Sequence, residues 1–113
     1  AARTLQGRAA LRCTTPDHLP LVGALPHRDA FLSDYATLRH NAKAVISHTG
    51  NYVEGLWIFT GFGGRGLCYI PLAAELLASQ LLHEPRPLPR GIQQALAPAR
   101  FAIRELVHTH AGR

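Results

Sequence analysis

The chain has 113 residues, which is enough for one domain or for one piece of a larger domain. Its content of 47% hydrophobic residues suits a folded core and argues against disorder along the whole chain. The net charge of +5 allows a polyanionic partner but does not require one.

Several classes of protein are disfavoured by what the sequence lacks. No apolar run is long enough to span a bilayer and the N-terminus lacks the form of a signal peptide, so no membrane partner is expected. Two cysteines, Cys13 and Cys68, are too few for a disulfide framework, which favours a reduced, cytoplasmic setting. We expect both to be buried thiols rather than nucleophiles. The seven histidines lack metal-ligand spacing, so no metal site is predicted.

In chain order, the first predicted elements are short. Residues 8–13 can form a strand with alternating faces, and residues 18–23 form an extended piece that Pro20 confines to an edge. Asp29 is a candidate cap for a helix running to about His40. A polar excursion is predicted to follow, up to residue 54.

The chain is organised around its central stretch. Residues 56–60 form a short apolar run that predicts a strand buried on both faces, and four glycines follow between positions 61 and 66. From Pro71 the pattern becomes helical, with one apolar stripe made of Leu72, Ala73, Leu76, Leu77 and Leu81. Strand, glycine loop and helix together place bare backbone N–H groups at the positive end of a helix dipole, which suits an electron-rich or anionic group.

The glycine loop by itself is weak evidence of function. It does not contain the phosphate-binding sequence G-x-x-x-x-G-K-[ST]. Gly61, Gly63 and Gly66 do match G-x-G-x-x-G, but no βαβ unit with an acidic strand end follows. A tight turn that needs positive φ angles explains the same glycines.

The last third of the chain is predicted to be helical after a break. A proline-rich segment, residues 84–89, ends the central helix, and a short helix is predicted at residues 91–96. A final helix begins at Pro98, with an inner face made of Ala102, Ile103, Leu106 and Val107. Four basic residues either face RNA phosphates or form a solvated face: Arg86, Arg90, Arg100 and Arg104.

This order of elements is awkward for a self-contained domain. Parallel strands need neighbours to fill a sheet, and only two or three strands are on offer. The chain is therefore predicted to be the closing part of a larger α/β fold.

Two segments carry a resemblance to a known family. Residues 8–23, through Arg8, Arg12, Asp17, Pro20 and Gly23, resemble a segment of the FAD-dependent amine and amino-acid oxidases, the D-amino-acid oxidase superfamily. Residues 60–67 (TGFGGRGL) resemble the last flavin-contacting loop of that superfamily.

A narrower resemblance is carried by four motifs. The motifs R-C-x-T-x-D-H-L-P, G-x-x-G-R-G-L-C, P-L-A-A-E-L-L-A and E-P-x-P-L-P are similar to the oxidase module of the bifunctional tRNA 5-methylaminomethyl-2-thiouridine biosynthesis proteins. The similarity covers about residues 7 to 107 and includes the segment Pro98–Phe101 ahead of a basic helix.

The resemblance implies a fold and an organisation. It implies the C-terminal fragment of a FAD/NAD(P)-binding, Rossmann-like fold of the D-amino-acid oxidase type, without the N-terminal dinucleotide-binding βαβ unit. Residues 1–28 would end the substrate-domain sheet and cross back to the FAD domain, and residues 29–54 would be a helix and a surface excursion. Residues 55–83 would be the closing strand, glycine loop and helix, and residues 84–113 the proline-rich tail and C-terminal helix.

The resemblance also implies a reaction. The module oxidises the carboxymethylaminomethyl group on the wobble uridine of certain tRNAs, so that the carboxymethyl unit is lost. FAD is the implied cofactor, and S-adenosylmethionine belongs to a separate methyltransferase module. The implied partners are tRNA and the upstream FAD-binding and methyltransferase modules of the same protein.

Site residues follow from the matched motifs. Arg12 falls where the related oxidases place the arginine that binds the substrate carboxylate, a role suited to a bidentate guanidinium. The flavin-contacting loop corresponds to residues Gly61, Gly63, Gly64, Arg65, Gly66 and Leu67, whose backbone donors would stabilise charge on the reduced ring. Arg65 could contact flavin, the substrate or a tRNA phosphate, or close the loop through an ion pair. Tyr69 stands where relatives often have a small residue.

Two other classes of function remain open at the level of sequence. One is a basic RNA-binding module, although the chain has only eight Phe, Trp and Tyr residues, spread thinly. The other is a structural module without catalysis. In the oxidase interpretation, this segment alone is expected to be inactive, to bind no FAD tightly, and to self-associate through exposed sheet edges.

Overall fold

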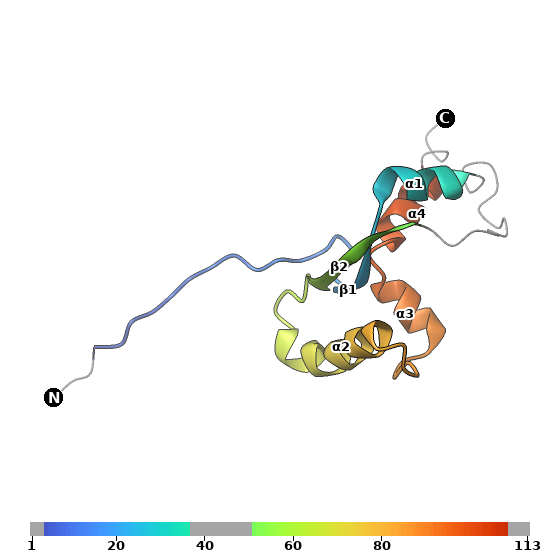
Figure 1. Cartoon of the computed structure of the whole chain (residues 1–113). Helices are drawn as coiled ribbons and strands as arrows, with labels where there is room; N and C mark the ends of the chain where they lie inside the picture. The colour runs from blue at the N-terminus through green and yellow to red at the C-terminus, as the bar shows by residue number, and fades with distance from the viewer. Residues whose placement is uncertain (1–3, 37–50, 109–113) are drawn as a thin grey trace.

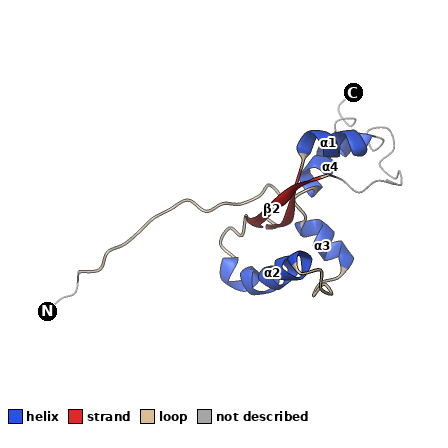
Figure 2. Ribbon diagram, viewed as in Figure 1, coloured by secondary structure: helices blue, strands red, loops and turns tan. Residues whose placement is uncertain are grey.

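The computed structural model describes residues 4–36 and 51–108 (Figures 1 and 2). Within these ranges the chain forms β1 (Leu21–Pro26), α1 (Arg28–Asp34), β2 (Tyr52–Thr60), α2 (Gly66–Leu81), α3 (Arg90–Leu96) and α4 (Arg100–His108). In Figure 1, α2 and α3 lie on one side of the strands, and α1 and α4 lie together at the opposite end of the strands.

The two strands pair in an antiparallel sheet, in the order β1-β2. Val22 lies opposite Phe59, and the pairing becomes irregular between Ala24 and Pro26. The prediction of parallel strands is therefore wrong for the described residues. The prediction that residues 56–60 are buried on both faces is also wrong, because Leu56 is 48% exposed. A sheet of two strands offers too few neighbours to cover both faces.

The main core lies between the sheet and α2 and α3. Its buried members are Val22, Ala73, Leu76 and Leu96, with Phe59 and Leu77 packed against them. Ala73, Leu76 and Leu77 were predicted to form the apolar stripe of α2, and they do face the core. Leu72 and Leu81, predicted on the same stripe, are half-exposed because their positions lie at its two margins.

The start of α2 differs from the sequence prediction. The helix begins at Gly66, five residues before Pro71, so that the proline lies inside it. Proline is tolerated best in the first turn of a helix, whereas Pro71 is the sixth residue of α2. The proline-rich segment does end the helix, as predicted, since α2 stops at Leu81.

A second, smaller contact joins α1 to α4. Phe31 of α1 and Leu106 of α4 are each 1% exposed, and Arg28 forms an ion pair of 2.9 Å with Glu105. Helix α1 begins at Arg28 with His27 as its N-cap, so Asp29 lies in the first turn and is not the cap. The helix also ends at Asp34, earlier than predicted, and residues 37–50 lie outside the described residues.

The two C-terminal helices were predicted almost correctly. Helix α3 spans Arg90–Leu96, one residue longer than expected. Helix α4 begins at Arg100 rather than Pro98, and Leu106 on its expected inner face is buried.

The segment before β1 was predicted less well. Residues 8–13 have no strand partner within the described residues, and the prediction of a strand there is wrong. Figure 1 shows this segment running away from the body of the protein as an extended chain. Cys13 and Cys68 are both exposed, which corrects the expectation of buried thiols. Within the described residues, no helix is long and apolar enough to cross a membrane.

Candidate functional site

The glycine loop between β2 and α2 has a backbone that only glycine adopts easily. Gly61 and Gly63 have φ angles of +79° and +54°, in the left-handed region. A Cβ atom on Gly61 would lie 3.0 Å from the methyl group of Thr15, and one on Gly63 would lie 3.0 Å from that of Thr14. The loop therefore packs tightly against the segment that precedes β1.

A backbone contact fixes this packing. The amide of Gly63 donates a hydrogen bond of 3.0 Å to the carbonyl oxygen of Cys13, and Thr14 forms an isolated bridge with Phe62. The residue before Cys13 is thereby held beside the loop. A Cβ atom on Gly64 would lie 2.8 Å from Nη1 of Arg12, so the guanidinium group lies directly against Gly64.

The structure thus brings together the predicted carboxylate-binding arginine and the predicted flavin-contacting loop. Arg12 and the loop share one cavity of about 300 Å³, lined by Arg12, Cys13, Phe59, Thr60, Gly61, Phe62, Gly63 and Ile70. Because most of these lining groups are apolar or backbone, the cavity combines a cation with a hydrophobic wall. The rings of Phe59 and Phe62 lie 4.8 Å apart and form part of that wall.

Free backbone donors lie beside this cavity. Arg65 donates its amide to the carbonyl of Phe62, and Cys68 and Tyr69 donate theirs to the carbonyl of Arg65. Within the described residues, the amides of Gly64, Gly66 and Leu67 donate no hydrogen bond. These groups stand at the N-terminal end of α2, where the helix dipole is positive.

The side chains of Arg65 and Leu67 do not enter the same cavity. Arg65 donates from Nη1 to the hydroxyl of Tyr69 at 3.3 Å, one turn along α2. Leu67 is 97% exposed, so only its backbone is placed to contribute. A second hollow of about 120 Å³ adjoins the loop and is lined by Thr14, His18, Phe62, Gly63, Gly64 and Arg65.

Sequence reasoning missed the charged group that holds the turn before β1. The carboxylate of Asp17 accepts from Nε and Nη2 of Arg100, at 2.9 Å each, and from Nη1 of Arg104 at 2.6 Å. The Arg100 hydrogen bonds, opposed in part by burial, hold the pKa of Asp17 well below its usual range. The signal in the sequence was an acid in a turn together with two arginines four residues apart.

This arrangement corrects the prediction for the basic residues of the last third. Arg100 is only 6% exposed and faces Asp17, so it does not belong to a surface stripe. Arg104 is turned toward the same carboxylate, and Arg86 donates to the backbone carbonyls of Ser79 and Glu84. Arg90 is exposed.

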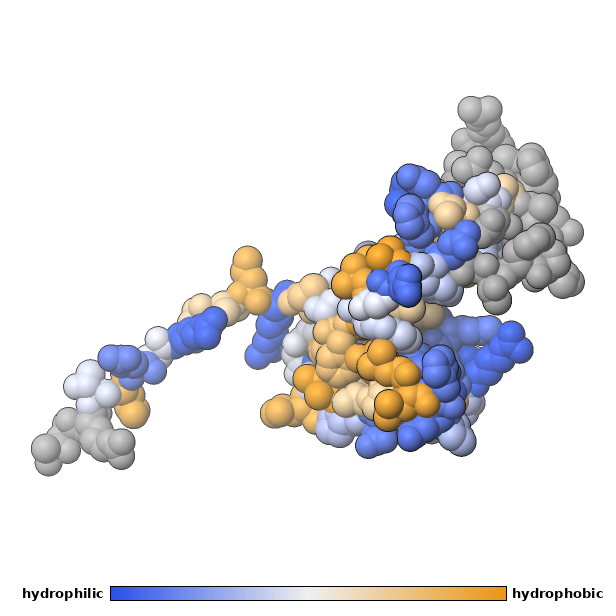
Figure 3. All heavy atoms as spheres, in the orientation of Figure 1, coloured by the Kyte–Doolittle hydropathy of each residue, from blue (hydrophilic) through white to orange (hydrophobic). Residues whose placement is uncertain are grey.

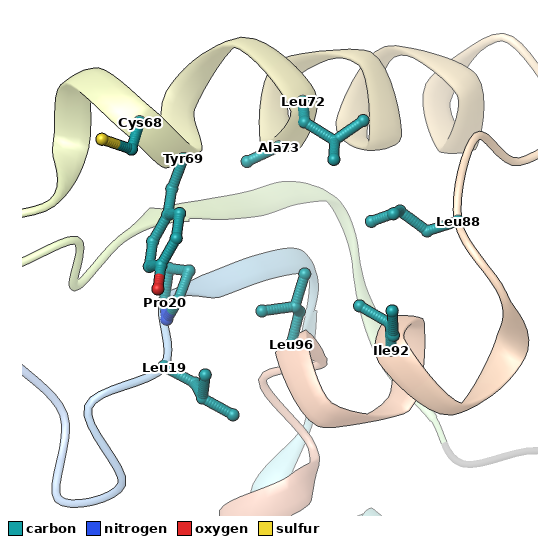
Figure 4. A pocket seen from close by; sticks show the side chains of 9 residues that line it. All are labelled: Leu19, Pro20, Cys68, Tyr69, Leu72, Ala73, Leu88, Ile92 and Leu96. Atoms are coloured by element: carbon teal, nitrogen blue, oxygen red, sulfur yellow. The ribbon is translucent and has the colours of Figure 1, made fainter.

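A separate apolar cavity lies between α2 and α3 (Figure 4). Its volume is about 300 Å³, and its lining contains no charged side chain: Leu19, Pro20, Cys68, Tyr69, Leu72, Ala73, Leu88, Ile92 and Leu96. The ring of Tyr69 reaches down from α2 toward Leu19 and Pro20 (Figure 4). Without a cation, this cavity does not suit a carboxylate, and the cavity beside Arg12 is the better candidate site.

Comparison with known proteins decides the family. Residues 1–80 match the family model described as DAO, FAD dependent oxidoreductase. The chain belongs to this family of FAD dependent oxidoreductases. Its mixed α/β structure is that of a fragment of a DAO-type fold, as the sequence resemblance predicted.

Three similar proteins share one name. The chain is 49% identical over 106 residues to the tRNA 5-methylaminomethyl-2-thiouridine biosynthesis bifunctional protein of Pseudomonas fluorescens, an alignment that covers 94% of this chain. Identity is 50% over 103 residues, or 91% of this chain, for the protein of that name from Pseudomonas syringae pv. syringae. For Pseudomonas aeruginosa it is 47% over 108 residues, or 96% of this chain.

These relatives are much longer than the chain. The matched segment makes up 16% of the length of each. The narrower resemblance found in the sequence is therefore confirmed for one segment of these bifunctional proteins.

Proposed function

We propose that the chain is part of a FAD-dependent oxidoreductase that removes the carboxymethyl group from 5-carboxymethylaminomethyl-(2-thio)uridine at the tRNA wobble position. The observation that carries the proposal is the guanidinium group of Arg12 lying against Gly64, at a loop with free backbone amides. Membership of a FAD dependent oxidoreductase family supports the cofactor. The name of these relatives, which refers to tRNA 5-methylaminomethyl-2-thiouridine biosynthesis, supports the substrate class.

The residues around the loop fit one edge of a flavin ring. The amides of Gly64, Gly66 and Leu67 supply donors. The absence of Cβ atoms on Gly63 and Gly64 lets Thr14 and Arg12 pack directly against the loop. Gly63 and Arg65 have their amides bonded within the protein, so in this proposal they shape the loop while the other three amides contact the ring. Flavin, when bound, supplies the acceptor for a hydride.

Arg12 has the chemistry to hold the other reactant. The substrate group is an N-substituted glycine, and its carboxylate matches the planar fork of a guanidinium. Binding there would place the carbon next to the carboxylate over the loop, which orients its C–H bond. Phe59 and Phe62 line the same cavity and give it an apolar wall. After oxidation to an imine, water cleaves the C–N bond and releases the carboxymethyl unit as an aldehyde acid.

The remaining parts of the proposal concern the whole protein. The upstream FAD-binding module would complete the flavin site, and a methyltransferase module that uses S-adenosylmethionine would methylate the amine that remains. We place this protein in the cytoplasm with tRNA as its partner. The alternative of a basic RNA-binding or structural module gains no support from Arg100 and Arg104, since both are turned toward Asp17.

The proposal is tested in the full-length protein with the variant Arg12→Ala. The matched control is Arg8→Ala, because Arg8 is an exposed arginine of the same segment that lies outside the cavity. The probe is a tRNA carrying 5-carboxymethylaminomethyluridine at the wobble position, and the readout is anaerobic bleaching of the flavin absorbance. Loss of a bidentate, charge-assisted contact is expected to lower kcat/KM by roughly 100-fold.

Flavin content should be the same in Arg12→Ala, in Arg8→Ala and in the wild type. A wild-type protein that this tRNA does not reduce would overturn the proposed function. Full activity in Arg12→Ala would overturn the role of Arg12 while leaving the reaction in place.

A further inference from the structure

Arg100 makes an unusually complete set of contacts for a residue outside the cavity. Its Nε and Nη2 bond the two oxygens of Asp17 at 2.9 Å, and Nη2 also donates to the carbonyl of Leu19 at 2.8 Å. Its Nη1 donates to the carbonyls of Leu96 and Ala97 at 3.2 Å each. All five N–H donors of the guanidinium are therefore used inside the protein.

Asp17, which Arg100 holds in place, in turn bonds to other residues of its own turn, residues 13–19. Its Oδ1 accepts the amide of Leu19 at 3.2 Å and lies 3.0 Å from the hydroxyl of Thr15. That hydroxyl lies 2.6 Å from the carbonyl of Leu19, and Thr15 is 7% exposed. The turn is thus held at its acidic residue by α4 and closed on itself by short contacts.

The other side of the same turn carries the glycine loop. The methyl groups of Thr14 and Thr15 pack on Gly63 and Gly61, and the carbonyl of Cys13 accepts the amide of Gly63. Arg12 comes directly before these residues. Residues 4–11, on the other side of Arg12, are exposed throughout and contribute no hydrogen bond within the described residues (Figure 1). The place of Arg12 against Gly64 therefore depends on the turn.

We propose that Arg100 is a positioning residue for Arg12, acting through Asp17 and the turn formed by residues 13–19. Helix α4 thereby sets where the substrate carboxylate is held, although α4 itself does not line the cavity. This inference rests on the proposed function of Arg12. Arg100 lies beyond residues 1–80, which match the family model, whereas Asp17 and the turn lie within them.

The geometry explains why an arginine is needed at this position. A lysine would keep the charge but has a single ammonium group, which cannot bond both oxygens of Asp17 and three carbonyls in these fixed directions. Arg104 does not replace Arg100, because it reaches only Oδ2 and is 46% exposed. Removing the buried partner would also leave the charge of Asp17 poorly compensated.

The first experiment is a double-mutant cycle in the full-length flavoprotein. The variants are Arg100→Leu, Arg12→Ala and the combination of the two, and the measurement is kcat/KM for the tRNA carrying 5-carboxymethylaminomethyluridine. A displacement of about 1 Å at a reacting group lowers rates by roughly 100-fold. Arg100→Leu is expected to lose about this factor, mostly as a higher KM. The double variant should be no worse than Arg12→Ala, since Arg100 would act only through Arg12.

Two further variants separate positioning from general destabilisation. Arg28→Ala removes an exposed ion pair between α1 and α4 and should leave kcat/KM within about twofold of the wild type. Arg100→Lys should fold and should still lose at least about tenfold in kcat/KM, because the charge remains but the fork geometry does not. If Arg100→Leu does not fold, Arg100→Lys takes its place in the cycle.

The second experiment does not depend on the substrate. Hydrogen exchange of the Gly63 amide, in the full-length protein, reports whether its bond to Cys13 persists. Exchange should be at least about tenfold faster in Arg100→Lys than in the wild type and in Arg28→Ala. Unchanged exchange at Gly63, or losses of kcat/KM that multiply in the double variant, would overturn the positioning role. A wild-type protein that fails to react with the tRNA overturns the proposed function, and the exchange result then decides this inference alone.

Discussion

At the scale of single residues, two arginines near the turn have opposite environments. Arg12 is exposed beside the cavity and, within the described residues, has no carboxylate partner. Arg100 is buried and has its guanidinium donors satisfied by Asp17 and three backbone carbonyls. An arginine with an open fork suits an anionic ligand, whereas a saturated one suits the architecture. In the proposed function, Arg12 binds the substrate and Arg100 holds the turn that positions it.

Asp17 makes the folded state less stable at acidic pH. The hydrogen bonds from Arg100 hold the pKa of Asp17 well below its usual range in the folded protein, while the unfolded chain protonates near pH 4. The folded state therefore gains stability above about pH 4, and this gain is lost as the pH falls below that value. We expect the melting temperature of the full-length protein to fall below pH 4, and the variant Asp17→Asn to show a weaker fall.

The same variant is expected to be less stable than the wild type at pH 7. Breaking a buried ion pair by removing one charge costs about 3–5 kcal/mol, whereas Arg28→Ala, at an exposed pair, should cost at most about 1 kcal/mol. Equal melting temperatures for Asp17→Asn and the wild type at pH 7, or identical acid profiles, would contradict the role of the Asp17–Arg100 pair.

At the scale of elements, the sequence indicated which pieces exist better than where they end. The run of residues 56–60, the glycines and the leucine-rich stretch correctly predicted strand, loop and helix, because apolar periodicity and glycine are strong local signals. The sequence favours Pro71 as the first helical residue, because proline is best tolerated in the first turn, and this pattern misses the actual start at Gly66. The sequence favours Asp29 as the cap because Asp is a preferred N-cap residue, whereas the structure has His27 at that position.

The candidate site was predictable only in part, because local sequence patterns do not show contacts between distant residues. Arg12 and the loop were found through motifs, and their juxtaposition follows from the fold. The Asp17–Arg100 pair joins residues 83 positions apart, and no local pattern shows such a contact. The exposure of Cys68 likewise depends on which side of α2 meets the sheet. The sequence does not decide this, because apolar residues lie on more than one side of the helix.

The contact between α1 and α4 should depend on one side chain. Leu106 is 1% exposed and packs where Phe31 is also buried, so Leu106→Ala leaves a cavity and is expected to cost about 2–5 kcal/mol. The matched control is Leu82→Ala, because Leu82 is 65% exposed and its truncation should cost less than about 0.5 kcal/mol. Thermal melting of the full-length protein measures both. Similar melting temperatures for the two variants would mean that α4 is not held by this contact.

At the scale of the whole molecule, the structure leaves much apolar surface open. Figure 3 shows hydrophobic side chains gathered over the part of the body that carries α2, and more along the extended N-terminal segment. Exposed leucines and isoleucines account for most of it: Leu5, Leu11, Leu56, Leu67, Ile70, Leu72, Leu81, Leu82 and Ile92. Patches of this kind mark surfaces that contact other protein, and here the chain spans 16% of the length of its relatives.

This surface leads to a prediction for the 113-residue chain expressed alone. With a two-stranded sheet and open apolar faces, the isolated chain is expected to self-associate. It is also expected to purify without colour, because in the proposed function it supplies only one edge of the flavin site. Mixing it with the upstream part of its parent protein and FAD should produce a yellow complex, seen by flavin absorbance and by size-exclusion chromatography. The variant Arg12→Ala should form that complex equally well, because Arg12 is assigned to the substrate and not to flavin.

The opposite results have a definite meaning. A monomeric chain that carries stoichiometric flavin by itself would show that the upstream part is not needed to complete the flavin site. A mixture that stays colourless, while the isolated chain binds tRNA at low salt and releases it as salt is raised, would favour the RNA-binding alternative, because phosphate contacts weaken steeply with salt. Colour that appears only in the mixture is the pattern expected of an oxidase segment.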